Sequence, residues 1–286
     1  MPLDRYRVRH GDRRALDRID PRDTGGFSRK TDALARLEGG LARLDALQER
    51  LYASDRYSLL LIFQGLDAAG KDSAIKHVLS GINPQGTEVR AFKVPSTEEL
   101  AHDFLWRAAK ALPGRGRIGI FNRSYYEDVL VVRVHDRLLA NRKLPDDRLT
   151  PEIWEERFDD IRAFERHLDR SATIVRKFFL HVSKKEQRDR LLARLDDPAK
   201  HWKFSIADLA ERDLWPRYRR AYAEAIAATS RTHAPWYVVP ADHKWFAHLV
   251  IAEAVIETLE GLDLSLPKPD RATRRQIELA RKRLSR

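Results

Sequence analysis

Hydrophobic residues along the chain follow two patterns, short apolar runs and longer stretches with apolar positions three and four apart. Short runs of four to ten residues are typical of buried strands, and spacings of three and four are typical of one helix face. The runs predict strands at residues 58–63, 87–94, 118–121, 173–182 and 236–239. Strands that alternate with helices indicate a parallel sheet covered by helices on both faces.

The helical stretches begin with a stripe at spacings of three and four, formed by Leu34, Leu37, Leu41, Leu44, Leu47 and Leu51. Ser96 with Glu99, and Ser183 with Glu186, have the spacing of a capping box, and Thr150 before Pro151 is typical of a helix start. Helices are therefore predicted over residues 28–51, 71–79, 96–112, 129–139, 151–168, 183–195, 212–229, 243–259 and 268–286.

These elements predict a three-layer α/β/α domain. Residues 1–27 are charged, with scattered glycine and proline, and are predicted to form an extended N-terminal arm. Residues 28–286 contain no repeat or low-complexity linker and are predicted to be a single domain. We expect residues 184–218 to form an appended lid.

Composition limits the classes of protein that fit. The chain has 286 residues, 43% of them hydrophobic, and no cysteine, so disulfides and thiolate metal sites are excluded. No apolar run approaches the roughly 20 residues that span a bilayer. The N-terminus lacks the apolar core of a signal peptide. We therefore expect a cytoplasmic protein that does not enter a membrane.

The chain is strongly basic, with a formal net charge of +11 and a pI of about 9.9. This charge favours an anionic partner such as nucleic acid, anionic lipid or a phosphate polymer, although it also suits a plain soluble surface. The excess of arginine over lysine fits bidentate phosphate contacts. A GC-rich genome would produce the same excess.

Residues 65–72 have the pattern of a phosphate-binding loop between a strand and a helix. Gly65 and Gly70 permit a tight turn whose N–H groups point at an anion, and Lys71 adds a mobile charge. Asp72 stands where such loops carry a metal-binding hydroxyl. Since carboxylates would repel phosphates without divalent cations, a metal-dependent polyphosphate site is predicted, with a simple strand–helix turn as the alternative. The predicted phosphate ligands are Gly65, Ala68, Ala69, Gly70, Lys71, Asp72 and Ser73.

Residues 122–128 follow the third predicted strand, where ligands meet the carboxyl end of a parallel sheet. This is the place of a Walker B element, but its first residue is Asn122 rather than Asp. Glu127 and Asp128 can supply carboxylates, and Arg123 can reach a phosphate. The alternative is an ordinary polar loop.

The predicted lid is rich in cations. Arg190 and Arg194 share a helix face, where like charges are destabilising unless an anion bridges them. The alternative is a solvated face neutralised by nearby acids. No histidine spacing indicates a structural metal site. The candidate polyphosphate ligands of the lid are Arg188, Arg190, Arg194 and Lys203.

Four segments together resemble the polyphosphate kinase 2 family. They are the glycine loop, residues 121–126, residues 197–203, and the pairs Pro235-Trp236 and Lys244-Trp245. Asp directly after the loop lysine belongs to that family's pattern. Many members carry Asp in place of Asn122, and the version here is similar to the class III subgroup. The resemblance implies a thymidylate-kinase-like P-loop fold with a lid over the active site.

The resemblance also implies the chemistry. Phosphoryl groups would pass reversibly between inorganic polyphosphate and nucleotides, converting AMP to ADP and ADP to ATP. The implied cofactor is Mg²⁺, with Mn²⁺ as a substitute, held near Asp67 and Asp128. The implied catalytic residues are Asp67, Lys71, Arg123 and Asp128, and the implied nucleotide contacts are Asn122, Arg123 and Glu127. Asp72 and Glu127 would tune the metal number or the choice of acceptor.

Three other functions remain open on the sequence alone. An ATP-dependent kinase of a small metabolite would share the fold. A basic nucleic-acid-binding protein would fit the net charge. The sequence contains no recognisable nucleic-acid-binding module, however, and no specific nucleic-acid partner is expected. A degenerate loop used only for assembly is the third. A homo-oligomer is expected, with the helix at residues 34–51 and the basic tail as candidate subunit contacts.

Overall fold

A sheet of five parallel strands in the order β2-β3-β1-β4-β5 organises the chain. The computed structural model describes residues 3–285, apart from the side chains of Asp136 and Lys203. The strands are β1 (Ser58–Gln64), β2 (Thr87–Ala91), β3 (Ile118–Asn122), β4 (Thr173–His181) and β5 (Trp236–Pro240). All five predicted strands are confirmed.

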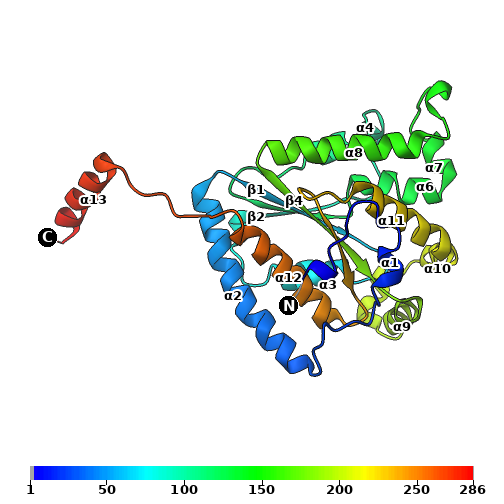
Figure 1. Ribbon diagram of the computed structural model, residues 1–286, viewed down its shortest axis with the longest axis horizontal. Helices are drawn as coiled ribbons and strands as arrows, with labels where there is room; N and C mark the ends of the chain where they lie inside the picture. Colours follow the sequence, from blue (N-terminus) through cyan, green and yellow to red (C-terminus); the bar gives the residue numbers. More distant parts are fainter. Residues whose placement is uncertain (1–2, 286) are drawn as a thin grey trace.

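The central strand is buried along its whole length because helices cover both faces of the sheet. Every residue of β1 is buried, which is why its sequence is a continuous apolar run rather than an alternating one. In Figure 1, α2 (Lys30–Ser54), α3 (Lys71–Val78) and α12 (Lys244–Glu260) lie on one side of the sheet, and α8 (Ile153–Arg170) and α11 (Trp215–Thr229) on the other. The predicted three-layer α/β/α architecture is confirmed.

The predicted leucine stripe packs inside the molecule. Leu44 and Leu51 on α2 are fully buried, while Leu34 at its first turn is exposed. The backbone of α2 approaches α12 closely at Gly40, where an added Cβ would lie 3.3 Å from the Ile256 side chain. The stripe therefore belongs to the core of one chain.

The remaining helices connect these elements or follow them, and most are short. The helices are α1 (Ala15–Arg18), α4 (Thr97–Leu100), α5 (Trp106–Ala109), α6 (Val131–Val134), α7 (Asp136–Ala140), α9 (Lys184–Leu195), α10 (Ala207–Asp213) and α13 (Arg271–Leu284). Single 3₁₀ turns occur at Leu3–Arg5, Pro84–Gly86, Tyr125–Asp128, Asp146–Arg148 and Pro198–Lys203.

Two predicted helices are interrupted. Ser96 and Glu99 form the expected capping box, but the helix ends at Leu100, and the Asp103 side chain then accepts from the N–H groups of Leu105 and Trp106, just before and at the start of α5. The stretch at 129–139 likewise divides into α6 and α7, whereas the helix predicted at 212–229 is found as α11, which begins at Trp215 after the short α10. Local side-chain caps explain the first break, since an Asp that binds nearby backbone N–H groups starts a new helix.

Two predicted boundaries are wrong. Strand β2 ends at Ala91, not Val94, so the following residues leave the sheet. Helix α8 begins at Ile153 with Glu152 as its N-cap, and the Thr150 hydroxyl, predicted to cap it, has no hydrogen-bond partner in the described residues.

The N-terminal residues lie along the outer edge of the sheet. The N–H of Val8 donates to the Trp236 carbonyl and the N–H of Val238 donates to the Tyr6 carbonyl, so the arm pairs with β5. Tyr6 is fully buried there. This pairing covers a strand edge that would otherwise be open. Within residues 3–285, no helix combines the length and apolar character needed to cross a bilayer.

Candidate active site

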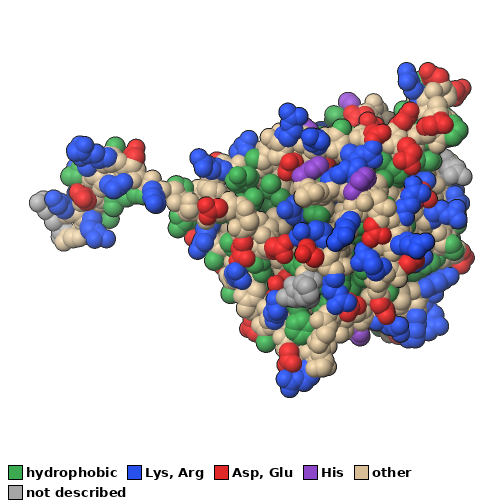
Figure 2. Space-filling model, in the orientation of Figure 1, with side chains coloured by type: hydrophobic (Ala, Val, Ile, Leu, Met, Phe, Trp, Pro, Cys, Tyr) green, Lys and Arg blue, Asp and Glu red, His purple; other side chains and the backbone are tan. Residues whose placement is uncertain are grey.

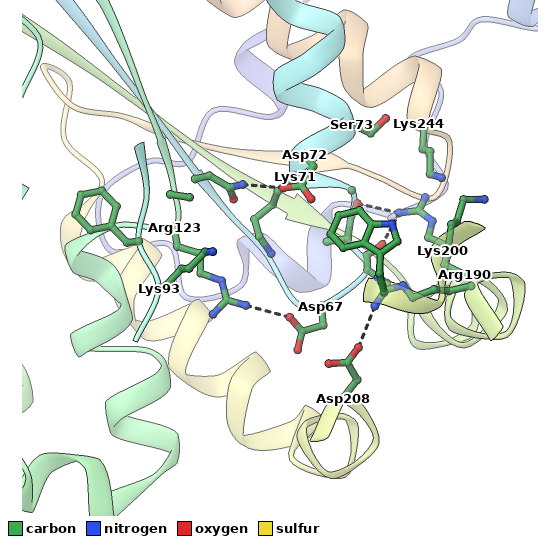
Figure 3. A pocket seen from close by; sticks show the side chains of 18 of the residues that line it. Asp67, Lys71, Asp72, Ser73, Lys93, Arg123, Arg190, Lys200, Asp208 and Lys244 are labelled. Carbon is green, nitrogen blue, oxygen red and sulfur yellow. Dashed lines mark hydrogen bonds and ion pairs between the residues drawn. The ribbon is translucent and has the colours of Figure 1, made fainter. Parts of the chain in front are cut away.

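A cavity of about 730 Å³ opens at the carboxyl ends of the strands, beside the segment predicted to form a lid (Figure 3). The glycine loop forms its floor, residues after β2 and β3 form one wall, and α9 to α10 form the other. Its charged lining consists of Lys71, Lys93, Arg123, Arg190, Arg194, Lys200 and Lys244, with Asp67, Asp72 and Asp208. Cations outnumber carboxylates, so the cavity suits a polyanion.

The glycine loop turns from β1 into α3 through backbone that glycine favours. Gly70 is the residue before α3 and has a φ of +104°, and Ala68 has a φ of +60°. Gly65 lies behind the cavity lining, where a Cβ would come within 3.2 Å of the Leu180 carbonyl oxygen. The first N–H groups of α3 have no partner within the helix and favour an anion. The predicted ligands from Ala68 to Ser73 all line the cavity.

Lys71 lies folded over its own loop. Its Nζ donates to the carbonyl oxygens of Gly65 at 2.6 Å and Leu66 at 3.2 Å. Burial lowers the pKa of Lys71, and the nearby Arg123 lowers it further, while neighbouring carboxylates oppose the shift. An arriving phosphate would offer this ammonium group an ionised acceptor, which makes a stronger hydrogen bond than a carbonyl.

Arg123 links two carboxylates at the end of β3. Its guanidinium lies 3.2 Å from Asp67 Oδ1 and 3.4 Å from Glu127 Oε2. Glu127 raises the pKa of Arg123, whereas burial raises the pKa of Glu127 itself. Arg123 has a φ of +62°, a strained value for a non-glycine residue. Glu127 lies behind Arg123 and does not line the cavity.

Asn122, where a Walker B aspartate would stand, binds a loop carboxylate. Its Nδ2 donates to Asp72 Oδ1 at 2.7 Å. A carboxylate at position 122 would face Asp72 as a like charge, whereas the amide supplies a donor. Asn122 therefore holds the Asp72 carboxylate in place.

The two arginines of α9 that line the cavity, Arg190 and Arg194, differ in what they contact. Arg190 donates to the carbonyl oxygens of Ala68 and Ala69 at 3.1 and 2.8 Å, and also to those of Ala241 and Asp242. It therefore fastens the glycine loop to α9. Arg194 lines the cavity and pairs with Asp208 at 3.0 Å.

The structure does not place Arg188, a predicted polyphosphate ligand, at this cavity. Its exposed side chain pairs with Asp189 and does not line the cavity. Residues two apart on a helix do not share a face, so Arg188 cannot accompany Arg190. Lys203 is also one of the predicted polyphosphate ligands, but its side chain lies outside the described part of the structure.

The structure does not bring Asp128, predicted to hold a metal with Asp67, to the cavity. Asp128 is fully buried, does not line the cavity, and lies 2.5 Å from the Arg142 guanidinium and 3.7 Å from that of Arg157. Burial raises the pKa of this carboxyl group, and the two arginines oppose the shift. The Asp128 carboxylate therefore pairs with Arg142 and Arg157 inside the fold instead of facing the cavity.

Sequence reasoning missed several cavity residues. Lys93 follows β2 and Lys244 follows β5, so both occupy carboxyl-end positions that the predicted topology marks as ligand sites. Asp208 was also missed, whereas Lys200 was one of the cations of the predicted lid, although it was not named as a ligand.

The cavity offers carboxylates for a divalent cation. Among the described residues no group of three or more His, Cys, Asp or Glu side chains forms a preassembled metal site. Asp67 and Asp72 both line the cavity beside Lys71. Magnesium usually takes one or two carboxylates and completes its shell with water and substrate phosphates, so this donor set fits it.

The chain is similar to known proteins over almost its whole length. Residues 28–266 match the family described as Polyphosphate kinase 2 (PPK2). An ADP-polyphosphate phosphotransferase of Rhodopseudomonas palustris is 47% identical over 98% of this chain and 97% of its own. An AMP/ADP-polyphosphate phosphotransferase of Meiothermus ruber is 45% identical over 96% and 99%. The crystal structure of polyphosphate kinase 2 from Arthrobacter aurescens matches with a TM-score of 0.88 at 42% identity, covering 98% and 96% of the two chains.

Proposed function

Because the chain belongs to the polyphosphate kinase 2 family, we propose that it transfers phosphoryl groups from inorganic polyphosphate to AMP and ADP. The reaction is reversible, so ATP and ADP can return phosphoryl groups to the polymer. The observation that carries this proposal is the cationic cavity around a glycine loop that itself contains Asp67 and Asp72.

The loop supports binding of the transferred phosphoryl group. Arg190 holds the carbonyls of Ala68 and Ala69, which fixes the turn from which the α3 N-terminus faces an anion. Lys71 exchanges its carbonyl partners for phosphate oxygens. Charge neutralisation in a preorganised site is the main contribution of a protein to phosphoryl transfer.

A divalent cation fits beside the loop. Asp67 and Asp72 are the residues that would hold it, and Mg²⁺ is the proposed ion, with Mn²⁺ as a substitute. When bound, such an ion neutralises phosphate charge that would otherwise meet these carboxylates. Asp72 accepts from Asn122, which orients its carboxylate.

The acceptor needs little help from a base. The second pKa of a phosphate monoester is about 6, so it is mostly dianionic at neutral pH. The obstacle is the approach of two polyanions, which positioning and cations overcome. Asn122 and Arg123 line the acceptor side, and Glu127 positions Arg123 from behind. Polyphosphate would be bound by the other cations of the cavity, which are Lys93, Arg194, Lys200 and Lys244.

The test is product analysis without ATP. The protein is incubated with magnesium, long-chain polyphosphate and AMP, and AMP, ADP and ATP are resolved over time. We expect ADP first and ATP afterwards. ADP alone would restrict the activity to AMP. A folded protein that forms neither, yet consumes ATP with a small metabolite, would refute the polyphosphate assignment.

The acceptor role of Glu127 has its own test. Glu127→Ala removes the carboxylate that pairs with Arg123 at 3.4 Å. We expect the ratio of AMP to ADP turnover to change, because the position of Arg123 at the acceptor changes. An unaltered ratio would remove Glu127 from acceptor selection.

A further inference from the structure

Helix α13 lies apart from the folded body at the end of an extended segment (Figure 1). Every residue from 265 to 285 is exposed. The helix nevertheless has a proper start, since the Asp270 side chain accepts from the N–H of Thr273 at 2.7 Å. Within residues 3–285, α13 is thus a capped helix that buries no side chain against the rest of the chain.

The two faces of α13 define what it can contact. Ile277, Ala280 and Leu284 lie three and four residues apart and form an apolar stripe, with exposed fractions of 52% for Ile277 and 89% for Leu284. The rest of the helix is basic, with Arg271, Arg274, Arg275, Arg281, Lys282 and Arg283 against a single acid, Glu278. A helix of this length is marginal by itself in water, so burial of the stripe would stabilise it.

The first half of α8 has the complementary charge. Its outer face carries five exposed acids three and four residues apart, namely Glu152, Glu155, Glu156, Asp159 and Asp160. Like charges at this spacing destabilise a helix. Among the described ion pairs, only Asp159 of the five has a partner, which is Arg162.

The connection that leads into α8 extends this surface. It adds the exposed acids Asp146 and Asp147, and two partly exposed leucines, Leu144 at 37% and Leu149 at 39%. Burial raises the pKa of Asp160, and the nearby Glu156 raises it further, while Arg157 opposes the shift. The surface thus offers both acids and apolar side chains.

The two surfaces lie at opposite ends of one molecule. In Figure 1, α13 is at the left end of the long axis, and the connection between α7 and α8 is at the upper right. Figure 2 shows many blue side chains on α13. It also shows red side chains gathered over the connection between α7 and α8. The segment joining α12 to α13 is already extended (Figure 1). The basic helix α13 and the acidic surface can therefore meet only when they belong to two different chains.

We propose that α13 of one chain docks on the acidic surface of a second copy of this chain. That surface consists of residues 144–160, which are the connection into α8 and the first half of α8. The stripe of α13 covers Leu144 and Leu149, and its arginines pair with the acids of α8. Two copies that exchange tails make the contact twice, which gives a closed twofold dimer. A phosphate polymer would meet the arginines but would leave the stripe exposed.

The absence of cysteine from the chain permits a direct test by cross-linking. A tagged Ile277→Cys chain is mixed with an untagged Leu149→Cys chain and oxidised, and the tag identifies the mixed disulfide on a non-reducing gel. We expect that product to form readily. A matched control replaces the α8-side cysteine by Glu49→Cys on the exposed face of α2. Equal yields from both mixtures would overturn the proposal.

Charge exchange provides the second test. Sedimentation equilibrium is measured for Arg274→Glu/Arg281→Glu, for Glu152→Arg/Glu156→Arg, and for the four changes together. Each pair is expected to weaken dimerisation about tenfold at low salt, since several surface ion pairs become repulsive. The combined variant should restore it. The control Asp45→Arg/Glu49→Arg makes the same charge change on α2 and should have no effect.

Other partners give different results. If the tail reversal raises KM for long-chain polyphosphate while the α8 reversal alters neither mass nor cross-linking, then α13 binds the polymer and the proposal fails. A full-length chain that is monomeric at low salt and millimolar concentration would also refute it. The nucleotide activity serves as the folding control, because neither surface belongs to the cavity.

Discussion

Residues 122–128 contribute to two clusters of charged side chains that differ in how completely they are enclosed. On the cavity side, Arg123 pairs with Asp67 and Glu127, and Asn122 binds Asp72. On the interior side, Tyr125 and Tyr126 both donate to the Glu165 carboxylate, at 2.9 and 2.8 Å, and the ammonium group of Lys177 pairs with the same carboxylate.

The interior cluster is closed. Lys177 and Glu165 are fully buried, and Lys177 also donates to the Tyr126 hydroxyl and the Thr229 carbonyl, so all three of its donors are used. The cavity cluster is open and strained, with left-handed backbone at Ala68 and Arg123. The difference separates charges that hold the fold from charges that await a ligand. The following variants test that separation.

The largest effect is expected inside the fold. Lys177→Met leaves Glu165 buried without a cation and should lower the free energy of unfolding by about 3–5 kcal/mol. Chemical denaturation measures this. Lys177→Met/Glu165→Gln should recover most of the loss, since the amide oxygen still accepts from the tyrosines. A single variant as stable as the wild type would show that this pair does not hold the fold.

In the open cluster, the loop lysine should affect activity instead. Lys71→Met is expected to lower kcat by about 10²–10³-fold, as loss of one preorganised charge contact does elsewhere. Its stability should be unchanged or higher, because burial opposes the charged form of Lys71. Initial rates and thermal unfolding test both parts. Lost stability with retained kcat would reverse the assignment.

A smaller effect distinguishes the two aspartates. Asp67→Asn removes a cavity carboxylate and should raise the magnesium concentration for half-maximal activity about tenfold. Asp128→Asn removes the partner of Arg142 and Arg157, so it should lower stability and leave the magnesium dependence unchanged. Magnesium titrations of both variants decide between them. A shifted requirement in Asp128→Asn would return that residue to the metal site.

The smallest effect concerns pH. Burial lowers the pKa of Lys177 from 10.5 to about 8. Between these values the unfolded chain binds more protons than the folded chain, so this group makes stability rise with pH, by at most about 1.4 kcal/mol per unit. We expect the free energy of unfolding of the wild type to rise with pH between 8 and 10, relative to that of Lys177→Met/Glu165→Gln. Parallel stability profiles from pH 8 to 10 would contradict it.

Much of the site was predictable because the chemistry lies in one short segment. The glycine loop is contiguous, and its glycines, lysine and aspartates stand at fixed separations, so their cavity placement followed from strand, loop and helix. The strands were predictable for a similar reason, since burial on both faces requires continuous apolar runs. The family resemblance rests on the same contiguous segments and is confirmed.

The tertiary structure decided the use of residues whose direction no periodicity encodes. Residues 122–128 form a strand end and a 3₁₀ turn, in which Arg123 pairs with Asp67 and Glu127, whereas Asp128 pairs with Arg142 and Arg157 away from the cavity. Arg190 fastens the loop because four backbone carbonyls meet its guanidinium, and those carbonyls come from two distant segments. Lys93 and Lys244 join the site because parallel strands bring their carboxyl ends to one edge. Sequence determined the elements and the loop chemistry, whereas long-range packing determined which charges are enclosed and which face the ligand.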